Sequence, residues 1–194
     1  MISASRMPRL AALAALLLAL LPTPSWAAVR ITFYSKELGA SFPHAFVMLD
    51  GTLDRNGERI EEDYGFSAKT ISPAILWGKV KGEVISDHNS SYVANSDRHF
   101  SLTLSDAEYD AVMATVARWR TAQQPSYDLD RKNCVHFIAD IATGLGLRPQ
   151  PKKGLMKKPR SFLESLTEAN RTWLLARGAV IHRRGASAAG RPAA

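Results

Sequence analysis

The sequence lacks a second cysteine, and Cys134 is the only thiol among its 194 residues. A lone cysteine cannot form an internal disulfide, so the fold has to be stabilised by an ordinary hydrophobic core. In an oxidising compartment a single cysteine is a liability unless it is buried and inert or retained for chemistry. The first question that the sequence raises is which of these two roles Cys134 has.

Several motifs of common functional sites are also missing. No spacing of His, Cys, Asp and Glu resembles a zinc site, and there is neither a glycine-rich phosphate loop nor a G-x-S-x-G turn. No interleaved aromatic and basic pattern indicates a surface on which nucleic-acid bases would stack. We therefore expect no metal, no other cofactor and no nucleic-acid partner.

Residues 1–27 have the pattern of a secretory signal peptide. Two arginines precede an apolar run at residues 10–21, which is too short to span a bilayer comfortably. Two prolines end the run, and residues 25–27 fit a small-x-small cleavage site. We predict cleavage before Ala28 and a periplasmic or secreted bacterial protein, with a retained membrane anchor as the alternative.

The net charge of +7 is unevenly distributed along the chain. Residues 151–194 carry ten Lys or Arg and two acids, whereas residues 28–150 carry thirteen basic and sixteen acidic residues. The basic pI therefore comes from the C-terminal segment. We expect most of that segment to be solvated, with contact to an anionic surface, such as lipid or a cell-wall polymer, as the functional alternative.

The periodic segments predict strands first and helices afterwards. Alternating or continuous apolar runs predict strands at residues 29–35, 44–51, 59–68, 82–86 and 99–105. A turn at residues 53–58, with Asn56-Gly57 at its tip, predicts a hairpin between the second and third of these.

Three helices are predicted after the strands. A capping box at residues 105–108 begins the first, Asn133 caps the second, and residues 161–178 form the third. Without βαβ alternation, the class is α+β, an antiparallel sheet with helices packed on it. We predict one domain at residues 28–178, in which a core at 29–147 precedes a basic loop and C-terminal helix at 148–178. The remaining residues, 179–194, are expected to be a disordered basic tail.

Cys134 occupies the first position of the second predicted helix. Free backbone N–H groups and the helix dipole at that position stabilise a thiolate, and they can also stabilise an oxyanion during acyl transfer. The alternative is structural, because cysteine is often buried and Cys134 shares the apolar side of the helix with Phe137 and Ile138. The local pattern leaves both roles open.

A nucleophilic cysteine needs a base, and His44 is the best placed of the five histidines. It begins an apolar strand that should be central in the sheet and therefore rigid, although a histidine satisfied by backbone groups is the alternative. His136 lies about 200° around the helix from Cys134 and faces away from it. His99 begins a strand and remains possible. The other two have less rigid surroundings, a polar loop for His88 and the basic segment for His182.

These residues together resemble a known superfamily. A histidine at the head of an early strand, then a hairpin, then Asn-Cys-x-His-Phe at a helix start is similar to the circularly permuted branch of the NlpC-like papain-fold superfamily. That branch includes the lecithin:retinol acyltransferase-like proteins. The matching residues are His44 in the sequence FPHAFVML and residues 133–137, and the resemblance spans residues 29–147.

The resemblance implies a papain-like fold in which Cys134 is the nucleophile and His44 the general base. The implied reaction is attack on an amide, thioester or ester carbonyl through an acyl-enzyme. One departure is clear, because the acyltransferase-like members carry a second histidine on the returning hairpin strand and this chain has none there. If Leu53 pairs with Glu58, then His44 faces Ser67, and a two-residue slip brings Asp63 near; these two are the candidate orienting residues.

Two functions follow from this reading of the sequence. The first is an exported cysteine hydrolase or acyltransferase, most simply an envelope peptidase or amidase acting on a peptidoglycan peptide or another acylated molecule. The second is a non-catalytic binding or scaffold domain of the envelope that uses the fold without the chemistry. The separation between His44 and the Cys134 sulfur distinguishes them, because a base has to reach its nucleophile.

Overall fold

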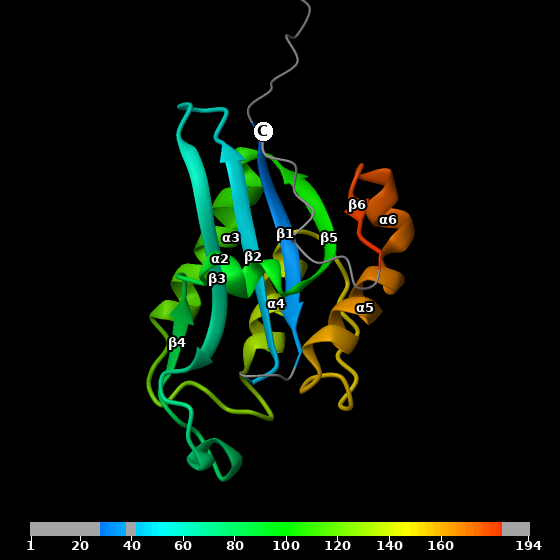
Figure 1. Ribbon diagram of the computed structural model, residues 1–194. Coiled ribbons are helices and arrows are strands. Elements are labelled where there is room, and N and C mark those ends of the chain that lie inside the picture. The colour runs from blue at the N-terminus through cyan, green and yellow to red at the C-terminus, as the bar shows by residue number, and fades with distance from the viewer. Residues whose placement is uncertain (1–27, 38–41, 184–194) are drawn as a thin grey trace, which may run out of the picture.

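Six antiparallel strands form one sheet in the computed structural model, which describes residues 28–37 and 42–183 (Figure 1). Their spatial order is β4-β3-β2-β1-β5-β6, so the strand that begins with His44 is internal, as predicted. The strands are β1 (Val29–Lys36), β2 (His44–Thr52), β3 (Arg59–Ala68), β4 (Gly82–Ile85), β5 (Asp97–Leu104) and β6 (Val180–Ile181).

Helices cover both faces of this sheet unequally. The long helices α3, α4 and α5 pack on one face, and the short helix α2 lies on the other (Figure 1). A 3-10 turn, η1, lies between β3 and β4. The α+β class is thus confirmed. The helical elements are η1 (Pro73–Leu76), α2 (Ser90–Ala94), α3 (Asp106–Arg120), α4 (Cys134–Gly144), α5 (Pro159–Ala169) and α6 (Arg171–Ala176).

Strand β2 is buried on both of its faces, because the helices sandwich it. Ala45, Val47 and Leu49 belong to the main core, which the sheet shares with α3, α4 and α5. The alternate residue Phe46 belongs to a smaller cluster on the opposite face, packed near α2 with Tyr34 and Val93, and we call it the α2-side cluster. Neighbouring residues along β2 therefore project into two different apolar environments.

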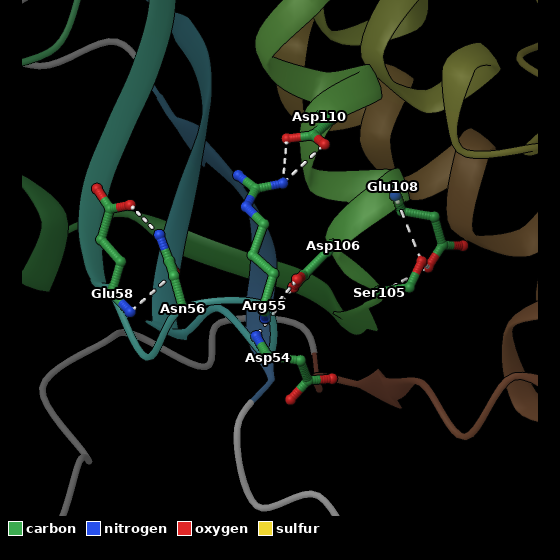
Figure 2. Close-up of polar contacts among 8 residues, drawn as sticks. All are labelled: Asp54, Arg55, Asn56, Glu58, Ser105, Asp106, Glu108 and Asp110. Carbon is green, nitrogen blue, oxygen red and sulfur yellow. Dashed lines mark hydrogen bonds and ion pairs between the residues drawn. The ribbon is translucent and has the colours of Figure 1, made fainter.

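The β2–β3 hairpin has the predicted register. The backbone N–H of Leu53 donates to the carbonyl of Glu58 at 2.9 Å, and Thr52 pairs with Arg59. The turn is closed locally by Asn56, whose side-chain oxygen accepts a hydrogen bond from the Glu58 N–H at 3.0 Å (Figure 2). Because side chains alternate along a strand, this register decides which residues of β3 share a face with His44.

The tip of the hairpin is attached to the start of α3. The Asp106 carboxylate accepts hydrogen bonds from the backbone N–H groups of Asp54 at 3.0 Å and Arg55 at 2.8 Å (Figure 2). The Arg55 guanidinium reaches Asp110 one turn further along the helix, at 2.7 Å. This ion pair is exposed and adds little stability, so the backbone contacts to Asp106 are what hold the hairpin against the helix.

Both predicted helix caps are present. Ser105 and Glu108 form the reciprocal capping box that begins α3, and Asn133 caps α4. The third predicted helix is divided in two at Asn170, whose side chain hydrogen-bonds the backbone of both Arg148 and Leu166.

The described fold extends beyond Gly178, because β6 pairs with the edge of β5. The strand places Ile181 opposite Phe100, so the start of the segment predicted as a tail belongs to the sheet. The proposed signal peptide at residues 1–27 and the tail from residue 184 onward lie outside the described residues. Within the described ranges, no helix has the length and apolar character needed to cross a membrane.

Candidate functional site

Cys134 is the first residue of α4 and lies in the main core. Its side chain is almost fully buried, and α4 packs across β2 and β3 at this point. Backbone N–H groups of Ala45, at the start of β2, and of Val135 and Cys134 itself lie near enough to the sulfur to favour its thiolate form. The start of α4 therefore does present several backbone donors to one thiol.

Burial outweighs these donors in setting the state of the thiol. The pKa of Cys134 is raised from 9.0 to about 11 because burial disfavours the thiolate, while the three backbone N–H groups lower it by less. No imidazole is among the groups that act on this pKa. Near neutral pH the Cys134 side chain is a protonated thiol, the weakly nucleophilic form.

His44 begins β2 but points to the opposite face from Cys134. Its ring stacks on Phe46 with a centroid separation of 6.2 Å and lies 5.5 Å from the ring of His88. Its Nε2 is packed directly against Gly65 of β3, where an added Cβ would lie only 2.3 Å from that nitrogen. These contacts place the imidazole with the α2-side cluster.

The sheet therefore lies between the two predicted catalytic side chains. Cys134 packs on the face of β2 to which Ala45 belongs, and His44 packs on the face to which Phe46 belongs. The physical reason is strand alternation: His44 and Ala45 are consecutive residues, so their side chains project in opposite directions. The structure brings the His44 backbone close to Cys134 but turns its ring away.

The pKa of His44 reflects this buried position. Burial lowers it from 6.5 to about 3, and the neighbouring His88 adds a smaller decrease. The buried Nε2 has no hydrogen-bond partner within the described part of the chain. His44 is therefore a neutral, apolar-packed imidazole at physiological pH, and no residue orients it through that nitrogen.

Asp63, one of the two candidate orienting residues, contacts a histidine, but that histidine is His88 and not His44. The Asp63 carboxylate contacts the His88 ring through Nδ1, and its Oδ1 lies 3.4 Å from the His88 backbone nitrogen. Ser67 lies on the same face of β3 in the predicted register, and it pairs with Glu83 of β4. The sequence did not reveal His88 as a neighbour of His44, because a loop residue carries no periodic signal.

Two further histidines, His99 and His182, form hydrogen bonds with serine hydroxyl groups of the sheet. His99 Nε2 lies 2.8 Å from the Ser35 hydroxyl, and His182 Nε2 lies 2.9 Å from the Ser101 hydroxyl. His136 Nδ1 accepts a hydrogen bond from the Asn133 backbone N–H at the start of α4. Among the described residues, no histidine hydrogen-bonds Cys134.

Two cavities lie away from the predicted catalytic side chains. The first, of about 230 Å³, lies between β5, β6 and α5, and the second, of about 220 Å³, lies between the ends of β3 and β4. Neither is lined by Cys134 or His44. Within residues 28–37 and 42–183, no group of His, Cys, Asp and Glu side chains is arranged to hold a metal ion.

The fold itself defines the class of this protein as an α+β domain with a six-stranded antiparallel sheet. No family model matches the chain, and neither a curated protein nor a solved structure is significantly similar to it.

Asn133 is the residue that holds the start of α4 in place. Its Oδ1 accepts from the N–H of Val135 at 2.8 Å, and its Nδ2 donates to the carbonyls of Leu129 and Met156, both at 2.8 Å. We expect Asn133→Ala to lower the free energy of unfolding by about 2 kcal/mol or more, because it leaves buried donors and acceptors unpaired. Urea denaturation measures this change.

A matched control is the asparagine that caps α2. Asn89 is exposed and accepts one hydrogen bond, from Tyr92 N–H at 2.8 Å, at the start of α2. Asn89→Ala should cost less than about 1 kcal/mol, because its groups are satisfied by water. Equal losses in the two variants would contradict the special role of Asn133.

Proposed function

We propose that this protein is a non-catalytic binding or scaffold domain, built on a permuted papain-like fold, in which Cys134 is a structural core residue. The observation that carries the proposal is the placement of Cys134 and His44 on opposite faces of β2. A general base has to come within hydrogen-bond reach of its nucleophile, directly or through one water. A ring on the far side of a close-packed sheet does not meet that condition.

The chemical state of both side chains also supports a structural role. The pKa of Cys134 is raised and that of His44 is lowered, so each group stays uncharged near neutral pH. An activated cysteine–histidine pair has the opposite signature, a thiolate beside an imidazolium. Both shifts have burial as their first cause, which is the environment of a core residue.

The proposed location is the bacterial periplasm or the exterior of the cell. The support is the signal-peptide pattern of residues 1–27, together with a domain that needs no disulfide and keeps its one thiol buried. In this setting the partners would be envelope components, and the basic segment after residue 150 would supply contact to anionic polymers.

A second candidate function is the cysteine hydrolase or acyltransferase. The arrangement that favours it is the start of α4, where the backbone N–H groups of Ala45, Val135 and Cys134 act to stabilise the Cys134 thiolate. Such donors could stabilise an oxyanion on a bound acyl group. For this function the thiol would have to become exposed, and another group would have to accept its proton. His99 is a candidate, because it contacts the hydroxyl of Ser35, which pairs with Ala45 on the Cys134 face of the sheet.

Thiol labelling of the native protein distinguishes the two functions. Cys134 is the only cysteine, so the reaction with iodoacetamide reports on it alone. We expect native Cys134 at pH 8 to react at least about a hundredfold more slowly than in urea, because a raised pKa lowers the thiolate fraction and burial blocks access. Labelling followed by mass spectrometry across pH 5 to 10 gives the profile.

The opposite profile would support the hydrolase. Rapid native labelling with a midpoint below about pH 7 is the behaviour of an activated thiolate and would refute the structural role. Denatured protein is the control for reagent quality. Cys134→Ala, which should remain folded because alanine suits the same apolar position, controls for labelling at other side chains.

A further inference from the structure

The loop between β3 and β4 exposes apolar side chains that nothing in the described structure covers. We call residues 69–81 the η1 loop. Figure 1 shows it projecting from the end of the sheet opposite the β2–β3 hairpin. Its exposed fractions are 80% for Trp77, 69% for Leu76 and 52% for Ile71. No residue of the η1 turn is buried.

The loop is held firmly at its base although its tip is exposed. The Lys69 N–H donates to the Lys81 carbonyl at 2.9 Å, and Val80 exchanges two backbone hydrogen bonds of 2.9 Å with Tyr127. The 3-10 turn is closed by hydrogen bonds such as that from Trp77 N–H to the Ala74 carbonyl at 3.1 Å. The apolar side chains are thus presented by an ordered turn.

Basic and hydroxyl groups surround the base of the same loop. Between residues 69 and 81 the sequence contains three lysines and no acid. Lys69, Lys81, Thr70 and Ser72 line the cavity of about 220 Å³ beside the apolar tip. Ammonium and hydroxyl donors around such a hollow suit a phosphate oxygen, so the charge at this position is complementary to an anionic partner.

This combination fits the surface of an anionic lipid bilayer. The transfer of tryptophan and leucine side chains from water into the headgroup boundary lowers the free energy. Lysines beside them are attracted to anionic headgroups. Phe42 is a further exposed apolar side chain, 62% accessible, and it precedes β2 at the end of the sheet where β3 stops. The basic hollow beside the apolar tip favours an anionic bilayer as the partner over an uncharged protein surface.

We propose that the η1 loop binds anionic phospholipid membranes by inserting Leu76 and Trp77 into the headgroup region while Lys69 and Lys81 contact lipid phosphates. This surface is formed by other residues of the chain than the basic segment after residue 150. The proposal also holds whether Cys134 is structural or catalytic, so it can succeed or fail without deciding that question.

Vesicle co-sedimentation with residues 28–194, which include every described element, tests the proposal. The vesicles are phosphatidylcholine alone and phosphatidylcholine mixed with phosphatidylglycerol. We expect binding to the mixed vesicles and weaker binding to neutral ones.

Leu76→Ser with Trp77→Ser should lower the partition coefficient by about tenfold or more, because the inserted apolar area is lost. Lys69→Glu with Lys81→Glu should lower it by about tenfold and reduce its salt dependence.

Matched variants elsewhere on the surface control for apolar and charge changes. Leu175 is 57% exposed on α6, and Arg59 is exposed at the hairpin end of β3. Leu175→Ser and Arg59→Glu should leave vesicle binding unchanged. Trp77→Phe should keep the binding but remove the blue shift of tryptophan emission that vesicles cause. Inorganic phosphate should not lower sedimentation more than sodium chloride of the same ionic strength does, because the proposed ligand is a bilayer and not a free anion.

Three results would overturn the proposal. The first is an absence of binding to anionic vesicles, which would leave a protein partner as the occupant of the loop. The second is binding that survives both loop double variants, which would place the membrane contact in the basic C-terminal segment. The third is equal binding to neutral and anionic vesicles, which would contradict the role of the lysines. Circular dichroism of each variant shows that a loss of binding is not a loss of fold.

Discussion

Gly65→Ala is expected to destabilise the fold by about 3 kcal/mol, because the new methyl group would occupy the position of the His44 ring. An ideal Cβ at this position lies 2.3 Å from His44 Nε2 and 3.2 Å from the Cβ of Phe46. The ring has little freedom to move away, since it is buried beside Phe46 and His88. Urea denaturation at pH 7 gives the change in the free energy of unfolding.

A double-mutant cycle isolates the steric cause. In a His44→Ala background the obstacle is gone, and Gly65→Ala should become neutral or stabilising, by up to about 1 kcal/mol, because alanine suits a strand better than glycine. Gly78→Ala is the control, because a Cβ added there meets nothing within 4 Å.

The cycle also tests the proposed function. The steric conflict exists only if the His44 ring lies over β3 on the α2 side, away from Cys134. A Gly65→Ala variant as stable as the wild type would show that the ring is elsewhere, and a catalytic His44 would then become tenable.

Mild acid is expected to unfold the protein, with His44 and His99 responsible. Burial lowers the pKa of His44 from 6.5 to about 3, and that of His99 to about 4 with a further decrease from Arg160 and His182. The unfolded chain binds these two protons as the pH falls below 6.5, whereas the folded protein does not. The stabilisation is therefore complete above pH 6.5 and is lost as the pH falls toward 4.

The slope of the free energy of unfolding against pH follows from the number of extra protons that the unfolded state binds. Two additional protons bound by the unfolded state correspond to a loss of about 2.7 kcal/mol per pH unit in the region of pH 5. Urea denaturation at intervals between pH 7 and 4.5 measures it. His88 lies beside His44 and is contacted by Asp63, whereas Arg160, His182 and Asp97 lie around His99.

Single substitutions show which histidines cause the pH dependence of the free energy of unfolding. His44→Leu and His99→Leu should each lower the slope by about half, by removing one proton from the difference between the two states. The comparison uses the slope, so a change in overall stability does not affect it. A free energy of unfolding that is the same at pH 7 and pH 5 would show that neither imidazole is buried in its neutral form.

The local patterns of the sequence predicted much of the fold. The turn at residues 53–58 determined the hairpin register, and the caps at Ser105 and Asn133 placed the starts of α3 and α4. Short elements without a full period were missed, namely α2 and β6. The division of the last helix was also missed, because the contact of Asn170 with Arg148 is a tertiary one.

For the candidate site, too, the local patterns of the sequence predicted the elements but not how they pack. The sequence by itself determined that Cys134 begins a capped helix and that His44 begins an internal strand, because caps, turns and apolar runs are local signals. Only the tertiary structure decided that the two side chains lie on opposite sides of the sheet. Both faces of β2 are apolar, so its sequence carries no sign of which face meets α4. That choice depends on how the helices pack against the whole sheet.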